Sequence, residues 1–267
     1  MHTIVIASGK GGVGKTSLAV NLAITLARAG KKTILVDADV AMASVGIMLG
    51  IDRAPISLHN VLMGDADVRD AVYDGPSGLK YVPSGLSLDR IKKVDYAKLK
   101  NAVDSLADTS EFVVVDSPPG LGPDAMAAIK SCRELILVVT PEPTSMADAL
   151  KIKSVAEKNN IKVIGVVSNF VTHDKTEIRK QDLETLLGIR IIAEIPDDFE
   201  ARRSSAMQKP VALRLPAAAY SRAVIQIANT LPGVEIKMIE GSKNSKGIFS
   251  KLSEAIGSLF GKKNRAR

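Results

Sequence analysis

Residues 7–20 read ASGKGGVGKTSLAV, a glycine-rich stretch between an apolar segment and a helical pattern. The segment before it, residues 3–7, is apolar and rich in β-branched side chains, which predicts a buried strand. After it, residues 17–29 carry leucines at helical spacing and are followed by Gly30, a residue type that often ends a helix. Strand, glycine loop and helix in this order form the context of a phosphate-binding loop.

The stretch fits the pattern G-x-x-x-x-G-K-[ST] from Gly9 to Thr16. Backbone amides of such a loop converge on phosphate oxygens at the positive end of the following helix. Lys15 would contact the β- and γ-phosphates, and the Thr16 hydroxyl would bind Mg²⁺. A simple glycine-rich turn also fits the pattern, but the flanking strand and helix favour a nucleotide site. The residues predicted to bind the nucleotide here are Gly11, Gly12, Val13, Gly14, Lys15, Thr16 and Ser17.

Apolar, β-like runs alternate with helical patterns along the rest of the chain. Strands are predicted at residues 32–36, 79–83, 111–116, 135–140, 163–168 and 190–195. Helices are predicted at residues 96–106, 123–130, 145–158, 177–187 and 217–230. The alternation predicts an α/β fold in which a mostly parallel, twisted sheet is flanked by helices on both faces.

Polar side chains gather where the predicted strands end, which is the edge at which such sheets bind ligands. Asp116 ends an apolar strand and fits the carboxylate that holds Mg²⁺ beside a phosphate loop. Asp39 follows the strand at residues 32–36, and two roles are open for it. It orients or activates the attacking water, or it caps the segment after it. Thr16, Asp39 and Asp116 together form the predicted Mg²⁺ site.

Composition limits the remaining classes of protein. The chain has 267 residues, enough for one large domain, and a single cysteine, Cys132, which excludes an internal disulfide or a two-cysteine metal site. The three histidines show no metal-ligand spacing, and no apolar run is long enough to span a bilayer. Because a strand begins almost at once, we expect no signal peptide and a cytoplasmic protein.

The C-terminal residues are basic and amphipathic. Seven basic residues and one acid lie from Lys243 onward, so this end carries most of the net charge of +7. Residues 241–247 are polar and predict a flexible linker after a P-loop domain of residues 1–240. On a helix, the apolar side chains of residues 248–260 fall within an arc of about 140°. Those predicted to contact a membrane are Ile248, Phe249, Leu252, Ile256, Leu259 and Phe260.

This pattern predicts that residues 248–267 form a tail that lies on an anionic membrane surface. Two alternatives stay open. The segment is a helix docked on the body, or the basic end binds DNA, which explains the charge but not the apolar face.

The lysine-rich loop, with Lys10 in addition to Lys15, resembles the deviant Walker A motif of the ParA/MinD class of P-loop ATPases, and within it the MinD branch. The resemblance extends along the chain. VDADVAMASVGIMLG (36–50) resembles the switch I region of that family, and VVVDSPPGL (113–121) resembles its Walker B motif and switch II. VVTPEPTSMADALK (138–151) and EIPDD (194–198) resemble the segments that follow.

The resemblance implies an ATPase with ATP and Mg²⁺ as cofactors and a homodimer in the ATP state. The extra lysine, here Lys10, would reach the phosphates bound by the partner subunit, so Lys10, Lys15 and Asp39 would be the catalytic set. Asn169, Pro196 and Asp198 would contact adenine. MinD-like members bind the inner face of the cell membrane peripherally and position a cellular system such as the division site; the sequence does not identify the protein activator or cargo.

Other branches are distinguished by composition. Iron–sulfur members need at least two cysteines per subunit, and the tyrosine kinases of this class carry a tyrosine-rich tail; this chain has one cysteine and four scattered tyrosines. A ParA-like DNA-partition ATPase and a regulator of flagellar number or motility stay open as alternatives.

Overall fold

The computed structural model describes residues 1–40, 42–51, 54–85 and 94–238, and these residues contain one eight-stranded sheet. The strand order is β3-β4-β2-β5-β1-β6-β7-β8, and every neighbouring pair is parallel except β3 and β4. The strands are β1 (His2–Ala7), β2 (Thr33–Asp37), β3 (Tyr73–Asp74), β4 (Lys80–Val82), β5 (Phe112–Asp116), β6 (Glu134–Val139), β7 (Lys162–Val171) and β8 (Ile191–Pro196).

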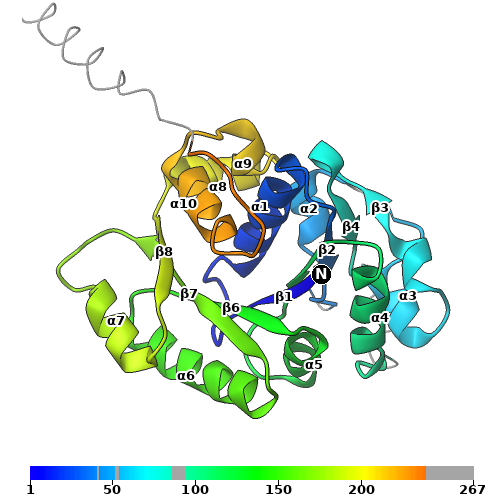
Figure 1. Cartoon of the computed structure of the whole chain (residues 1–267), viewed down its shortest axis with the longest axis horizontal. Helices are drawn as coiled ribbons and strands as arrows, with labels where there is room; N and C mark the ends of the chain where they lie inside the picture. Colours follow the sequence, from blue (N-terminus) through cyan, green and yellow to red (C-terminus); the bar gives the residue numbers. More distant parts are fainter. Residues whose placement is uncertain (41, 52–53, 86–93, 239–267) are drawn as a thin grey trace, which may run out of the picture. The chain divides into compact units, whose positions relative to one another are not determined.

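Helices cover both faces of this sheet (Figure 1). One face is covered by α1 (Lys15–Arg28), α2 (Val45–Leu49), α9 (Val211–Arg214) and α10 (Ala219–Ala228), with α8 (Phe199–Ala206) beside α9. The other face is covered by α3 (Leu58–Met63), α4 (Lys98–Ala107), α5 (Pro123–Ser131), α6 (Pro143–Lys158) and α7 (Lys180–Leu187). Two 3₁₀ turns, η1 (Val68–Ala71) and η2 (Pro76–Gly78), lie near β3.

Alternation along the central strands produces two separate apolar cores. In β1, Ile4 and Ile6 pack into the core under α1 and α10, whereas Val5 and Ala7 pack into the core on the opposite face. All four are buried, because a parallel strand in the middle of such a sheet is covered on both sides. Continuous apolar runs, rather than alternating ones, therefore mark these strands in the sequence.

The predicted fold class is confirmed, and the long elements lie close to their predicted positions. Gly30 has a φ of +80° just past the end of α1, in agreement with its predicted role. The prediction missed the short elements α2, α3, α8, α9 and β3. It also began the helix at 177–187 too early, since α7 starts at Lys180.

Candidate functional site

The glycine loop lies between β1 and α1, as the sequence predicts, and its backbone needs glycine. Gly12 and Gly14 have φ values of +78° and +94°, in the left-handed region. Two features exclude a side chain at Gly14: the positive φ, and a Cβ that would lie 2.2 Å from Nδ2 of Asn169. Nδ2 of Asn169 donates a hydrogen bond of 2.7 Å to the carbonyl oxygen of Val13. The end of β7 thus holds the loop in place.

Lys15 begins α1, so its charge lies at the amino-terminal end of the helix. Its side chain is largely buried, with only 7% of the residue exposed. Burial lowers the pKa of the Lys15 ammonium group, and the carboxylates of Asp116 and Asp39 partly oppose this effect. A buried cation at a helix amino terminus is suited to bind an anion such as phosphate.

Two buried carboxylates lie at the ends of neighbouring strands, and one of them, Asp116, is close enough to Lys15 to raise the pKa of its ammonium group. Asp37 of β2 and Asp116 of β5 occupy paired positions in the sheet register. Burial raises the pKa of Asp37 to about 7, against three backbone hydrogen bonds that lower it. Burial and the nearby Asp37 raise the pKa of Asp116 to about 8, and Thr16 and Lys15 act in the opposite direction. The positive charge and hydrogen bonds near Asp37 and Asp116 are therefore too few to balance two negative carboxylates.

These groups fit Mg²⁺. Asp116 is fully buried, and neither of its carboxylate oxygens has a hydrogen-bond partner of good geometry among the described residues. The Thr16 hydroxyl adds a second oxygen donor on the adjacent first turn of α1. The described ranges contain no group of three or more His, Cys, Asp and Glu side chains able to hold a metal. Mg²⁺ in nucleotide sites typically uses one or two protein oxygens together with phosphates and water.

Asp39 makes a hydrogen bond that fits the capping role, one of the two roles that the sequence left open for it. Its Oδ1 accepts a hydrogen bond of 2.9 Å from the backbone amide of Met42, so it caps the segment that follows. Its charge also raises the pKa of Lys15, which places it near the phosphate end of the site. The capping role and the catalytic role of Asp39 are both compatible with this position, and its catalytic role and its predicted place in the Mg²⁺ site stay predictions.

Lys10 projects from the loop and contacts a different element from Lys15. Its Nζ lies 3.3 Å from Oε2 of Glu142, the residue just before α6. The side chains of Lys10 and Glu142 are 49% and 56% exposed, so this ion pair contributes little stability. Lys10 is held at the surface by a weak contact, and its predicted action on a partner subunit stays a prediction.

A cavity of about 280 Å³ lies on the other side of the loop and joins the predicted adenine residues to it. Gly14, Ser17, Asn169, Pro196 and Asp198 all line this cavity. Oδ1 of Asn169 is buried without a hydrogen-bond partner among the described residues. The Asp198 side chain accepts a hydrogen bond of 2.8 Å from the amide of Glu200 and caps α8.

Sequence reasoning missed several residues of this region. Phe170, Arg202 and Tyr220 also line the cavity, and the Tyr220 hydroxyl donates to Oγ of Ser17 at 3.0 Å. Burial raises the pKa of Tyr220 to about 12, so the phenol stays protonated. Phe170 could have been predicted, because it directly follows Asn169 in the sequence. No sequence pattern indicates Tyr220, which comes from α10.

The predicted linker at residues 241–247 and the predicted membrane residues Ile248, Phe249, Leu252, Ile256, Leu259 and Phe260 lie outside the described residues. Within residues 1–237, which form one unit, the structure describes all but eleven positions. Among the helices it describes, none has the length and apolar character needed to cross a bilayer.

The chain is similar to known P-loop and ATP-binding proteins along most of its length. The model of the ParA family, described as NUBPL iron-transfer P-loop NTPase, matches residues 1–232. An uncharacterised ATP-binding protein of Methanocaldococcus jannaschii is 36% identical over 260 residues, which cover 97% of this chain and 97% of that protein.

Two solved structures are similar in both fold and sequence. The cell division ATPase MinD of Pyrococcus furiosus has a TM-score of 0.83 and 32% identity, covering 86% of this chain and 97% of that one. The septum site-determining protein MinD of Pyrococcus horikoshii, solved with Mg-ADP, has a TM-score of 0.84 and 31% identity, covering 87% of this chain and 96% of that one.

Proposed function

Because the chain belongs to the ParA family of P-loop NTPases, we propose that it is a Mg-ATP-dependent ATPase that dimerises with ATP bound, attaches reversibly to the membrane and positions another cellular system. The observation that carries the proposal is the arrangement of Lys15 and Thr16 opposite the buried carboxylate of Asp116. A buried cation and an unsatisfied buried anion a short way apart suit a ligand that carries both phosphate and a divalent cation.

The chain's own residues have separate tasks in this reaction. Backbone amides of residues 11–16 and the Lys15 ammonium group bind the phosphates and hold them at the start of α1. Thr16 and Asp116 are the residues that would hold Mg²⁺, which neutralises phosphate charge when it is bound. Asp39 orients or activates the attacking water, a task that fits its position near Lys15.

Selection of adenine follows from the fixed orientation of Asn169. Since Nδ2 donates to the carbonyl of Val13, Oδ1 is the atom left to face the cavity. A carbonyl oxygen accepts from the exocyclic amino group of adenine and repels the exocyclic oxygen of guanine. The same hydrogen bond connects base recognition to the shape of the phosphate loop.

Dimerisation would complete the site through Lys10. The site of one subunit already has Lys15 buried against the phosphate position, whereas Lys10 lies half exposed at the surface. A lysine so placed is accessible to a second subunit, where it would neutralise charge on the transferred phosphoryl group. Hydrolysis is then expected only in the dimer, which makes the reaction slow at low protein concentration.

Membrane attachment rests on the sequence of residues 248–267. One amphipathic segment holds weakly, and two on one dimer hold much better because the second binds at a high effective concentration. ATP would therefore control attachment by controlling dimerisation, on the inner face of the cell membrane. The cargo or activator would bind the membrane-attached dimer in preference to the free protein.

Sedimentation with vesicles tests the proposal. The protein should pellet with anionic vesicles in Mg-ATP and stay in solution in Mg-ADP, and its specific ATPase activity should rise with protein concentration. ATP-dependent binding to DNA, with no binding to vesicles, would assign the chain to DNA partition instead. Activity that is independent of protein concentration would contradict the dimer.

Iron transfer, which the description of the family model names, is not part of this proposal. The chain has one cysteine, Cys132, and burial raises the pKa of its thiol to about 12. A metal-binding cysteine acts as a thiolate, and such a thiol is inert at neutral pH.

A further inference from the structure

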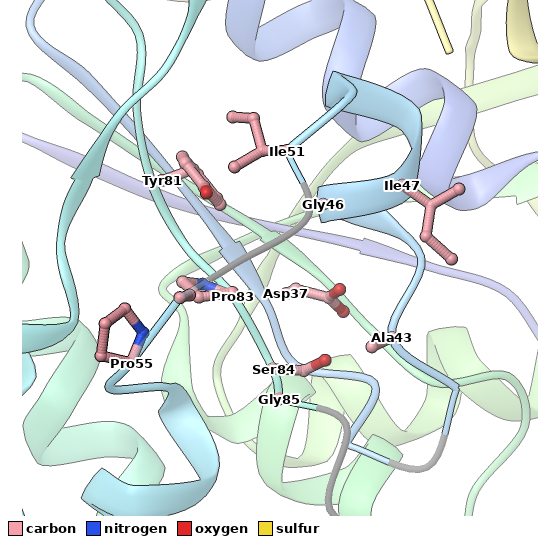
Figure 2. A pocket seen from close by; sticks show the side chains of 11 residues that line it. Asp37, Ala43, Gly46, Ile47, Ile51, Pro55, Tyr81, Pro83, Ser84 and Gly85 are labelled. Atoms are coloured by element: carbon pink, nitrogen blue, oxygen red, sulfur yellow. The ribbon is translucent and has the colours of Figure 1, made fainter. Parts of the chain in front are cut away.

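A second cavity, of about 480 Å³, lies beside α2. Its walls come from α2, from residues 51, 54 and 55 after it, and from residues 83–85 after β4 (Figure 2). None of the P-loop residues lines it. The volume is within the range of pockets that hold small organic ligands.

The walls of this cavity are mainly apolar. Ile47 and Ile51 contribute from the α2 side, and Tyr81 and Pro83 contribute from β4 and just beyond it. Figure 2 shows the Asp37 carboxylate near the centre of the labelled residues and the Ser84 hydroxyl below it, with Ile51 and Tyr81 above and Pro55 to the left. An apolar cavity with polar groups at one place favours a ligand with an apolar body and one polar end.

Ser84 is the residue that indicates a ligand. It is fully buried, and its Oγ has no hydrogen-bond partner among the described residues. Its backbone is fixed, because its carbonyl oxygen accepts a hydrogen bond of 3.1 Å from the amide of His59. A buried hydroxyl without a partner is unfavourable, so a group that supplies the missing hydrogen bond gains affinity there.

The Asp37 carboxylate is already engaged and does not compete for the same role. Its Oδ2 accepts from the amides of Ser44 and Val45, both at 3.1 Å, and its Oδ1 accepts from the amide of Asp39 at 3.2 Å. The carboxylate thus fixes the start of α2 and forms part of the cavity's polar end.

We propose that this cavity is a second binding site, outside the nucleotide site, for a small and largely apolar molecule whose single hydroxyl or amine group hydrogen-bonds to Ser84. The inference goes beyond the ATPase function, and binding at this site does not require a nucleotide.

The site is connected to the metal end of the nucleotide site through one short path. Ser44, which precedes α2, donates from its hydroxyl to the Thr16 hydroxyl at 3.3 Å, and its amide is bound by Asp37. An occupant that contacts Asp37 and α2 bears on the same segment. Occupancy is therefore expected to change the affinity for Mg-ATP, and Mg-ATP must change the affinity of the occupant by the same factor.

The probe for the test is 2-naphthol, with naphthalene as the matched compound that lacks the hydroxyl. Titration of the full chain without nucleotide should give saturable one-to-one binding of 2-naphthol. Ser84→Ala should weaken it at least tenfold, and naphthalene should bind Ser84→Ala and wild type alike. Ala54→Trp, which fills the cavity, should abolish binding, whereas Ser221→Ala, which removes a buried hydroxyl bonded to the carbonyl of Leu215, should not change it.

A second measurement uses the single native cysteine. Cys132 is buried with a raised pKa, so it should not react with N-ethylmaleimide in the folded protein. Ala54→Cys, at a partly exposed position of the cavity wall, should react and should be protected by 2-naphthol, while the buried Ser221→Cys should be inert. The proposal is overturned if wild type shows no saturable binding of 2-naphthol, or if Ser84→Ala and Ala54→Trp both bind it like wild type. An unchanged dissociation constant for Mg-ATP at saturating 2-naphthol would overturn the coupling.

Discussion

Asn169 donates its side-chain amide to the carbonyl oxygen of Val13 at 2.7 Å, and this bond joins the end of β7 to the phosphate loop. The contact is close enough that position 14 has no room for a Cβ atom. One amide therefore fixes the loop on one side, and on the other its oxygen lies toward the cavity that Pro196 and Asp198 also line.

Asn169→Ala should weaken ATP binding about tenfold, the effect of losing one hydrogen bond and its anchoring of the loop. It should also reduce the preference for ATP over GTP. Asn159→Ala is the matched control, because its exposed amide bonds only the carbonyl of Val155. Calorimetric titration with both nucleotides is the measurement. An unchanged ratio of ATP to GTP affinity would remove Asn169 from base selection.

Lys15→Ala and Lys10→Ala should separate binding from assembly. Lys15→Ala should weaken nucleotide binding by about tenfold or more, because a buried phosphate charge loses its partner. Lys10→Ala should bind ATP as a monomer but neither dimerise nor hydrolyse it. Lys151→Ala, which removes an exposed lysine paired with Asp148, is the control. Sedimentation velocity and phosphate release are the readouts, and normal dimerisation of Lys10→Ala would contradict action in trans.

Asp39→Ala should keep ATP binding and slow hydrolysis about 100-fold or more, which would trap the dimer and the membrane-bound form. Asp39→Asn distinguishes the two roles, since an amide oxygen can still accept from Met42 but carries no charge. If the cap alone matters, Asp39→Asn restores turnover. If the charge matters, it is as slow as Asp39→Ala in a phosphate-release assay.

Stability of the nucleotide-free protein should fall as pH rises from about 4 to about 8. The pKa values of Asp37 and Asp116 are raised by burial to about 7 and about 8, so in this window the folded state binds more protons than the unfolded state. Asp116→Asn should flatten the fall and stabilise the protein at pH 8 by on the order of 1 kcal/mol or more. Thermal unfolding at pH 5, 6.5 and 8 measures this. Parallel curves for variant and wild type would rule out the carboxylate pair as the cause.

Removal of residues 248–267 should leave a folded ATPase and abolish binding to anionic vesicles. Ile256→Glu should act almost as strongly, because it places a charge near the middle of the apolar face. Ser253→Glu is the control, with the same charge on the polar face. Wild-type binding should weaken but not vanish in high salt, since the apolar part is not screened. If the truncated and full-length proteins pellet equally, the tail is not the membrane anchor.

The fold, and the position of the glycine loop between β1 and α1, could be predicted from the sequence because both depend on local signals. The glycine loop has a fixed spacing, and buried parallel strands are continuous apolar runs. Residues that act through tertiary contact were not predictable in the same way. Tyr220 reaches Ser17 across 203 positions, and the partnership of Lys10 with Glu142 spans 132. Short elements such as α2 were also missed, because its start is held by Asp37 rather than by its own sequence.

The strand order has a consequence for synthesis of the chain on the ribosome. β1 emerges first but pairs in the sheet with β5 and β6, and His2 lies opposite Phe112. At about 5–20 residues per second, β1 waits roughly 5 to 20 s for its first neighbour. During that time its apolar side chains are exposed, because β2, β3 and β4 can pair with one another but β1 joins them only through β5. Nascent chains of this protein are therefore expected to depend on chaperones until β6 has emerged.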